Sequence, residues 1–114
     1  MNKTHRIDFA VMLTALLAGC CDRDADRNIL DAQTDFYCPT SSKVSYEPWS
    51  ECGLMKVCID PGTKKKNGSQ FAAQGGKMRS KALYTLGNEV GGWTEYDSNG
   101  NTEMKIGGYK APAW

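Results

Sequence analysis

Cysteine is the residue type with the most chemical potential in this 114-residue sequence, which contains five of them. None stands in a Cys-x-x-Cys motif, the spacing that lowers thiol pKa values in redox proteins and supplies two ligands in many zinc sites. Cys52 and Cys58 are six positions apart, and Cys38 stands alone. The spacing therefore argues against a catalytic redox site or a metal site. It favours structural disulfides if the chain is exported.

The sequence offers little for enzymatic chemistry. Its only histidine is His5, near the N-terminus. If the N-terminal segment is removed on export, no histidine remains, so a serine or cysteine nucleophile lacks its usual base and a metal lacks imidazole ligands. Glu47 and Glu51 flank Trp49, and paired carboxylates can hydrolyse glycosidic bonds, but acidic residues at this density are ordinary on a protein surface. We therefore expect no enzymatic activity, no cofactor and no metal.

Aromatic residues in the last third of the chain are the candidates for a binding surface: Tyr84, Trp93, Tyr96 and Tyr109. On an open sheet they could form an exposed strip that contacts a partner. Aromatic side chains are also what neighbouring strands use to pack against each other. Both uses are compatible with the sequence.

The N-terminal segment has the order of a secretory signal. Residues 1–6 are basic, an apolar run covers residues 9–17, and the small residues Ala18 and Gly19 follow. The run is shorter than the roughly 20 residues that span a bilayer. The sequence at residues 17–20, Leu-Ala-Gly-Cys, resembles the lipobox of bacterial lipoproteins. This resemblance implies that residues 1–19 are removed, that Cys20 is acylated, and that the lipid holds the protein in a membrane. In this family an Asp after the lipidated Cys favours the inner membrane. Cys21 stands there, which favours the periplasmic face of the outer membrane.

Removal of residues 1–19 would leave 95 residues with 12 basic and 12 acidic side chains. The neutral net charge of this chain argues against nucleic-acid binding, because proteins that bind nucleic acids carry a basic surface. Export would place the remaining thiols in an oxidising compartment, and we expect a disulfide between Cys38 and Cys58, which closes a loop of about twenty residues. A Cys52–Cys58 bond is the alternative, and Cys21 could stay free beside the anchor.

The chain divides into four parts by composition. After the signal, residues 20–28 are polar and charged, which indicates a tether that leads from the lipid to the domain. Residues 29–65 form a cysteine-bearing segment, in which one short helix is possible over residues 29–37 before Pro39. Alternating apolar residues near positions 44–46 and 55–60 predict strands. Residues 66–110 contain an internal repeat.

The repeat appears when the chain is shifted by 25 residues: Phe71 then falls on Tyr96, Gly75 on Gly100, and Tyr84 on Tyr109. Each copy reads as a strand, a glycine-bearing turn and a return strand. Asn99-Gly100 is the strongest hairpin signal, because both residues tolerate positive φ. We therefore predict a mainly β fold, an antiparallel meander of stacked β-hairpins.

The second copy, with Gly91-Gly92-Trp93, Tyr96, Asn99-Gly100 and Tyr109, resembles the MORN-variant repeat found in bacterial proteins often labelled antitoxin-like. The first copy departs from that pattern, because Phe71 replaces the tyrosine and no tryptophan follows Gly68. The resemblance implies a twisted meander of hairpins and no enzyme. The expected function is a membrane-anchored, non-catalytic binding or scaffold module with an unidentified protein partner. The alternative is an immunity or antitoxin-type protein that neutralises an envelope toxin.

Overall fold

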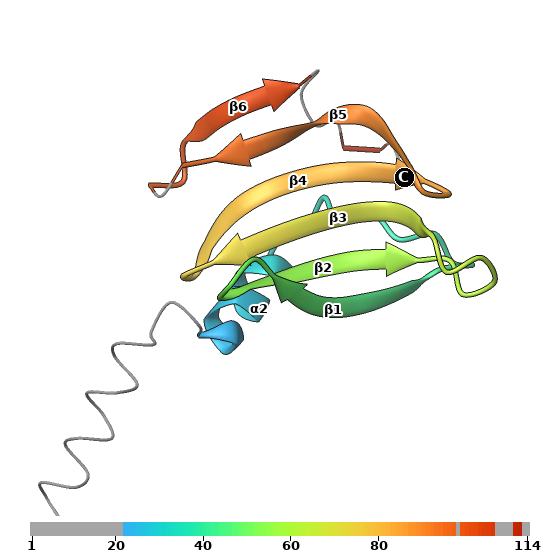
Figure 1. Ribbon diagram of the computed structural model, residues 1–114, viewed down its shortest axis with the longest axis horizontal. Coiled ribbons are helices and arrows are strands. Elements are labelled where there is room, and N and C mark those ends of the chain that lie inside the picture. Colours follow the sequence, from blue (N-terminus) through green and yellow to red (C-terminus); the bar gives the residue numbers. More distant parts are fainter. Residues whose placement is uncertain (1–21, 98, 107–110, 113–114) are drawn as a thin grey trace, which may run out of the picture.

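The computed structural model describes residues 22–97, 99–106 and 111–112, and it has one antiparallel sheet and one helix (Figure 1). The sheet order is β1-β2-β3-β4-β5-β6, so each strand pairs with its neighbour in sequence. This confirms the predicted mainly β meander with a short helix before it. The elements are α2 (Arg23–Asp31), β1 (Lys43–Trp49), β2 (Gly53–Ile59), β3 (Lys66–Gln74), β4 (Lys77–Thr85), β5 (Asn88–Tyr96) and β6 (Thr102–Ile106).

Helix α2 begins earlier than the predicted range of residues 29–37 and takes up most of the predicted tether. Asp22 caps its first turn, because the Asp22 side chain accepts a hydrogen bond from the Ala25 backbone N–H at 3.1 Å. Asp24 and Asp26 also lie in this turn, where negative charge is favourable for the helix dipole. Ile29 and Leu30, which had suggested a helix start, form its last turn instead.

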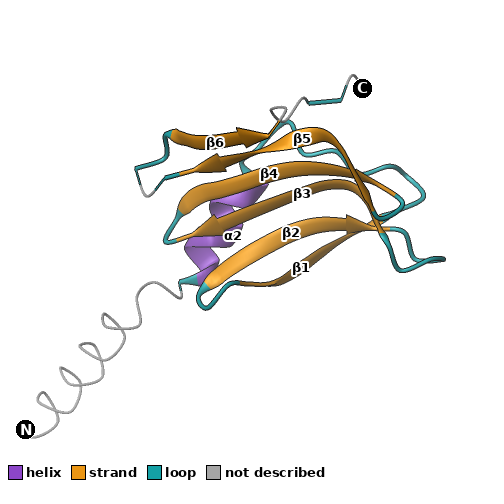
Figure 2. Ribbon diagram, turned by 45° about the horizontal axis from the view of Figure 1, so that its top comes forward, coloured by secondary structure: helices purple, strands orange, loops and turns teal. Residues whose placement is uncertain are grey.

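The helix covers one face of the sheet and forms the core with it (Figure 2). Leu30 packs with Leu54, Phe71 and Ala73, and this cluster is almost fully shielded from solvent. Phe36, from the segment after the helix, meets Phe71 edge to face with 5.1 Å between ring centroids. Burial of each large apolar side chain stabilises the fold by about 1.5–3 kcal/mol. This face of the sheet is therefore structural.

Two-residue turns with left-handed backbone connect the central strands. Gly75 and Gly76 join β3 to β4 with φ angles of +65° and +73°, and Leu86 and Gly87 join β4 to β5 with φ angles of +45° and +90°. Positive φ at both central residues matches the right-handed twist of the flanking strands. The central hairpins are thus tight and hold a fixed register.

The turn between β5 and β6 lies where the sequence predicts it. Gly100 has a φ of +89°. The Asp97 side chain organises the turn by accepting hydrogen bonds from the backbone N–H groups of Asn99 and Asn101, at 2.9 and 3.0 Å. Local side-chain bonds of this kind from an aspartate stabilise a turn.

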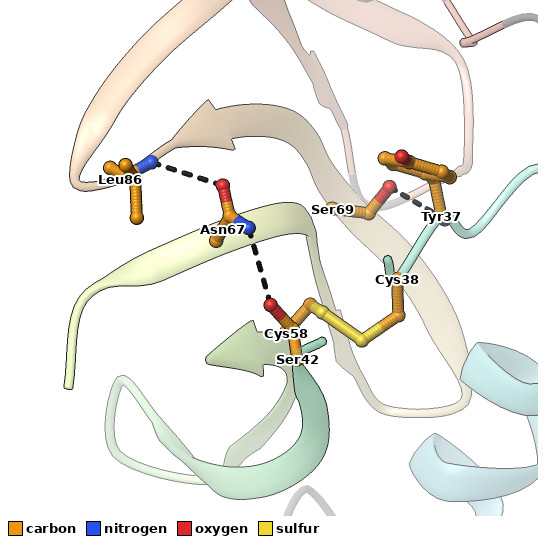
Figure 3. Close-up of a disulfide and its surroundings, with 7 residues drawn as sticks. All are labelled: Tyr37, Cys38, Ser42, Cys58, Asn67, Ser69 and Leu86. Atoms are coloured by element: carbon orange, nitrogen blue, oxygen red, sulfur yellow. Dashed lines mark hydrogen bonds between the residues drawn. A yellow bond between two sulfur atoms is a disulfide. The ribbon is translucent and has the colours of Figure 1, made fainter. Parts of the chain in front are cut away.

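The predicted disulfide between Cys38 and Cys58 is confirmed, with 5.4 Å between the two Cα atoms (Figure 3). It fastens the segment after the helix to β2. The same segment is bonded to β3, since the Tyr37 carbonyl accepts from Ser69 N–H and the Tyr37 N–H donates to Ser69 Oγ, both at 2.8 Å. A closed loop of this length contributes roughly 3 kcal/mol by the chain-entropy model.

Asp26 is a buried carboxyl group that joins the helix to the β3–β4 turn. Its Oδ1 accepts a hydrogen bond from the Gly76 backbone N–H at 2.6 Å, whereas its Oδ2 has no hydrogen-bond partner within the described part of the chain. Burial raises the pKa of Asp26 above the ordinary aspartate value. The folded state therefore holds this proton more tightly than the unfolded state does. Its contribution to stability is present at low pH and is lost as pH rises through the folded-state pKa.

We predict that Asp26→Asn gains stability relative to the wild type as pH rises from about 4 to about 7, because the amide keeps an acceptor for Gly76 N–H and carries no charge. Urea denaturation at several pH values measures this difference. Asp24→Asn, in the same helical turn but exposed, is the control and should show no such trend. Parallel stability curves for Asp26→Asn and the wild type would contradict the prediction.

Candidate binding groove on the open sheet face

The sheet register gathers one set of side chains on the face opposite the helix. Residues directly opposite each other on antiparallel strands project to the same side. Ala82 on β4 is opposite Gln70 on β3 and Trp93 on β5, and Ser80 is opposite Glu95. Figures 1 and 2 show this broad side of β2–β5 free of the helix, which lies behind the strands. These residues therefore form rows on an open face.

A groove of about 330 Å³ lies on this face, within the size range of small-ligand sites. Four aromatic side chains line it: Trp49, Tyr84, Trp93 and Tyr96. Ala82, which is buried, is the small residue among them. The groove joins residues from four strands, β1, β3, β4 and β5, so its shape depends on the whole sheet.

Trp49 reaches the groove from β1 because β2 begins with a glycine. A Cβ atom added at Gly53 would lie only 2.7 Å from Trp49 Cε3 and 2.8 Å from the Ala73 carbonyl oxygen. No other residue type leaves room for the indole ring beside this backbone. Ala72, on the groove side of β3, is also small and is fully buried. Small residues on β2 and β3 thus allow a wide aromatic wall.

Three buried polar atoms in the groove lining lack hydrogen-bond partners among the residues that the structure describes. They are Gln70 Oε1, Arg79 Nε and Trp93 Nε1. Buried polar atoms are nearly always bonded, and each unmet group costs about 1–3 kcal/mol. The residues that line the groove therefore contain one acceptor and two donors whose hydrogen bonds are not met within the described chain.

The groove combines opposite charges with neutral phenols. Arg79 and Glu95 both line it, so it has no strong preference for one sign of charge. Burial raises the pKa of Tyr84, with Glu89 adding to the effect, and burial with nearby Asp35 raises the pKa of Tyr96. Both hydroxyl groups therefore stay protonated at neutral pH and can donate hydrogen bonds.

Three of the four aromatic residues named from the sequence, Tyr84, Trp93 and Tyr96, come together in this groove. Tyr109 and the predicted lipidation site Cys20 lie outside the described residues. Sequence reasoning missed Trp49, Gln70 and Arg79. For Trp49 a signal existed, since it is a tryptophan next to a strand end. Gln70 and Arg79 look like ordinary polar strand positions, and nothing in the sequence indicated that they line a groove.

The groove lining contains few acidic groups among the residues that the structure describes. Among the described residues, Glu95 is the carboxylate that lines the groove, and Glu47 and Glu51 do not contribute to the lining. Within the described ranges, no three His, Cys, Asp or Glu side chains come close enough to hold a metal ion. No helix in the described part of the chain is long and apolar enough to cross a membrane.

Comparison of the chain with protein-family models, curated proteins and solved structures finds no match.

Proposed function

We propose that this protein is a membrane-anchored envelope lipoprotein that acts as a non-catalytic binding module, and that the groove on the open sheet face is its binding surface. The observation that carries the proposal is the groove itself. It brings together four aromatic side chains and three buried polar atoms without partners in the described chain. Aromatic walls and unmet donors are features of sites that bind an extended peptide segment. The partner is then another protein of the envelope.

Anchoring through Cys20 is the second part of the proposal. It is supported by the charge–apolar–small order of residues 1–19 and by the lipobox-like residues 17–20. The position after Cys20 is held by Cys21, which favours the periplasmic face of the outer membrane. The resemblance to MORN-variant repeats supports a hairpin module that displays a surface and carries out no reaction.

Photo-crosslinking in living cells tests the binding surface. Tyr84, in the groove, is replaced by the photoreactive p-benzoylphenylalanine. Tyr46 is replaced in the same way as the matched control, because it packs with the core cluster on the helix-covered face. Illumination should give an adduct with a partner protein from position 84 and not from position 46. Equal adducts from both positions, or none from position 84, would contradict the assignment.

The identity of the crosslinked partner also distinguishes between the two proposed functions, a binding or scaffold module and an immunity or antitoxin-type protein. An immunity or antitoxin-type protein would be captured with a toxic protein encoded beside it. A scaffold module would be captured with a structural or enzymatic component of the envelope. In both cases the groove is the contact surface, because a toxin would meet the same aromatic wall.

A further inference from the structure

We propose that one end of the sheet docks on an anionic lipid surface and leaves the binding groove accessible. This end, the cationic tip, consists of the first residues of β1, β3 and β5 and of the β2–β3 and β4–β5 turns (Figure 1). Its lysine residues are Lys43, Lys64, Lys65 and Lys66, and its exposed aliphatic residues are Val44, Leu86 and Val90. The proposal goes beyond the proposed function and rests on it only for the location at an envelope membrane.

Hydrogen bonds hold the segments of the cationic tip together. The Gly87 backbone N–H donates to the Lys66 carbonyl oxygen at 2.8 Å, which joins the β4–β5 turn to the start of β3. The Asn67 side chain accepts from the Leu86 N–H and donates to Ser42 Oγ, both at 3.2 Å (Figure 3). This one side chain therefore links the β4–β5 turn to the residue before β1. The tip is a continuous, ordered surface.

Positive charge is in excess on this surface. Lys64 and Lys65 are exposed in the β2–β3 turn. Ile59 is opposite both Lys43 and Lys66, which places these two lysines in one row across the end of the sheet. The acidic side chains at this end of the described chain are Asp60 and Glu89, and the lysines outnumber them. Lysines clustered in this way are attracted to anionic lipid headgroups.

Exposed aliphatic side chains accompany the lysines. Leu86 is 47% exposed and has a φ of +45°, a backbone conformation that bulky residues rarely adopt. Val44 and Val90 are also exposed, and these three are the large hydrophobic residues that the described part of the chain leaves in solvent. Packing within the described fold does not explain them. Aliphatic residues beside lysines are typical of surfaces that enter the interface of a bilayer, where the boundary of the acyl chains buries the apolar groups.

The sheet register shows which side of the sheet the exposed valines occupy. Val44 is opposite Cys58, which is disulfide-bonded to the segment after the helix. Val90 is opposite Leu83, which is in turn opposite Ser69, and Ser69 is hydrogen-bonded to the same segment. Because opposite residues project to the same side, both valines lie on the side that carries the helix. A contact through these valines is inclined toward that side, so the groove on the other side stays open to a partner protein.

Photo-crosslinking to lipid tests the cationic tip. The photoreactive p-benzoylphenylalanine replaces Leu86 or, in a second variant, Val90, and the full-length protein is reconstituted in phosphatidylcholine vesicles with added phosphatidylglycerol. We expect a lipid adduct, seen as an increase in the mass of the chain, from both positions. Glu47 is the matched control, because it is exposed on β1 two residues before the groove residue Trp49 and thus on the groove side. An equal lipid adduct from position 47, or none from positions 86 and 90, would overturn the proposal.

Lysine variants test the role of charge. The double variant Lys64→Gln and Lys65→Gln should lower the lipid adduct from position 90 at least about fivefold, the effect expected of one lysine near an anionic surface. Lys77→Gln, an exposed lysine at the opposite end of β4, is the control and should keep the adduct. An adduct that does not depend on Lys64, Lys65 or phosphatidylglycerol would overturn the proposal.

The same photoreactive variants in living cells distinguish a lipid from a protein as the occupant of the tip. Position 86 should give lipid adducts there, and an adduct with an acidic protein in their place would overturn the proposal. Fatty-acid labelling of the protein reports the anchor independently. Lipid adducts from position 86 of an unlabelled protein would support the docking and contradict the anchoring, whereas a labelled protein without them would contradict the docking alone.

Discussion

Gly68→Ala should destabilise the domain by at least about 3 kcal/mol, because no side chain fits at this point of β3. Gly68 has a φ of +129°, a conformation that other residues rarely adopt. An added Cβ would lie 2.7 Å from the Tyr37 carbonyl oxygen and 2.8 Å from Cys58 Cβ. Neither neighbour can move away easily. Tyr37 is hydrogen-bonded to Ser69 through both its N–H and its carbonyl group, and Cys58 is disulfide-bonded to Cys38 (Figure 3).

Urea denaturation of the oxidised domain measures this effect, with Gly62→Ala as the matched control. Gly62 does not have a positive φ, and the atom nearest to an added Cβ there is Asp60 Oδ2 at 3.5 Å. The control should therefore stay within about 0.5 kcal/mol of the wild type. A Gly68→Ala variant with the wild-type midpoint would show that this contact between β3 and the disulfide is not rigid.

Cys20→Ala should abolish fatty-acid labelling of the protein and leave the N-terminal segment in place. The reason is chemical, because alanine has no sulfur to carry the diacylglyceryl group on which processing depends in the lipoprotein family. A single acyl chain binds a membrane only marginally, at about 0.8 kcal/mol per buried methylene, and two or more chains hold firmly. The loss of the whole lipid should therefore be an all-or-none effect.

Metabolic labelling with a fatty acid and the apparent mass of the chain read out this prediction. Cys21→Ala is the matched control, since it changes the adjacent cysteine and should keep both the label and the processing. Normal maturation and labelling of Cys20→Ala would contradict the anchoring. Separation of the membranes tests the sorting expectation, and fractionation of the wild type with the inner membrane would count against it.

The strands could be predicted because their signals are local, and the Cys38–Cys58 disulfide because export and loop length favoured this pair. Alternating side chains and glycine-bearing turns define the hairpins, and Cys58 lies within an alternating strand. The helix was placed too late because its buried face includes Asp26, a residue type that reads as solvent-exposed. The Asp22 cap was a sequence signal for the true start of the helix.

The groove could be predicted only in part. Tyr84, Trp93 and Tyr96 belong to the repeat and share one stretch of sequence. Trp49 lies far from them in the chain and joins them because six strands pair in sequence order and Gly53 leaves space for its ring. The β-bulges in the strands that form the groove, between Ala72 and Ala73 and between Ala82 and Leu83, change which side chains share a face. The adjacent glycines Gly91 and Gly92 inside β5 were a signal for the second bulge, whereas the first bulge has no glycine to mark it.

The measurement that tests the central claim most directly is the affinity of the purified domain for the partner captured at position 84. Trp93→Ala is compared with Val44→Ala, which removes an exposed side chain on β1 that does not line the groove. Melting curves and circular dichroism confirm that each variant is folded, and Arg79→Ala serves as a second groove variant that leaves the aromatic wall intact. We predict that Trp93→Ala raises the Kd by at least about 30-fold, the effect of losing a contact worth about 2 kcal/mol, and that Val44→Ala changes it by less than about twofold. An unchanged Kd for folded Trp93→Ala and Arg79→Ala domains would contradict the account.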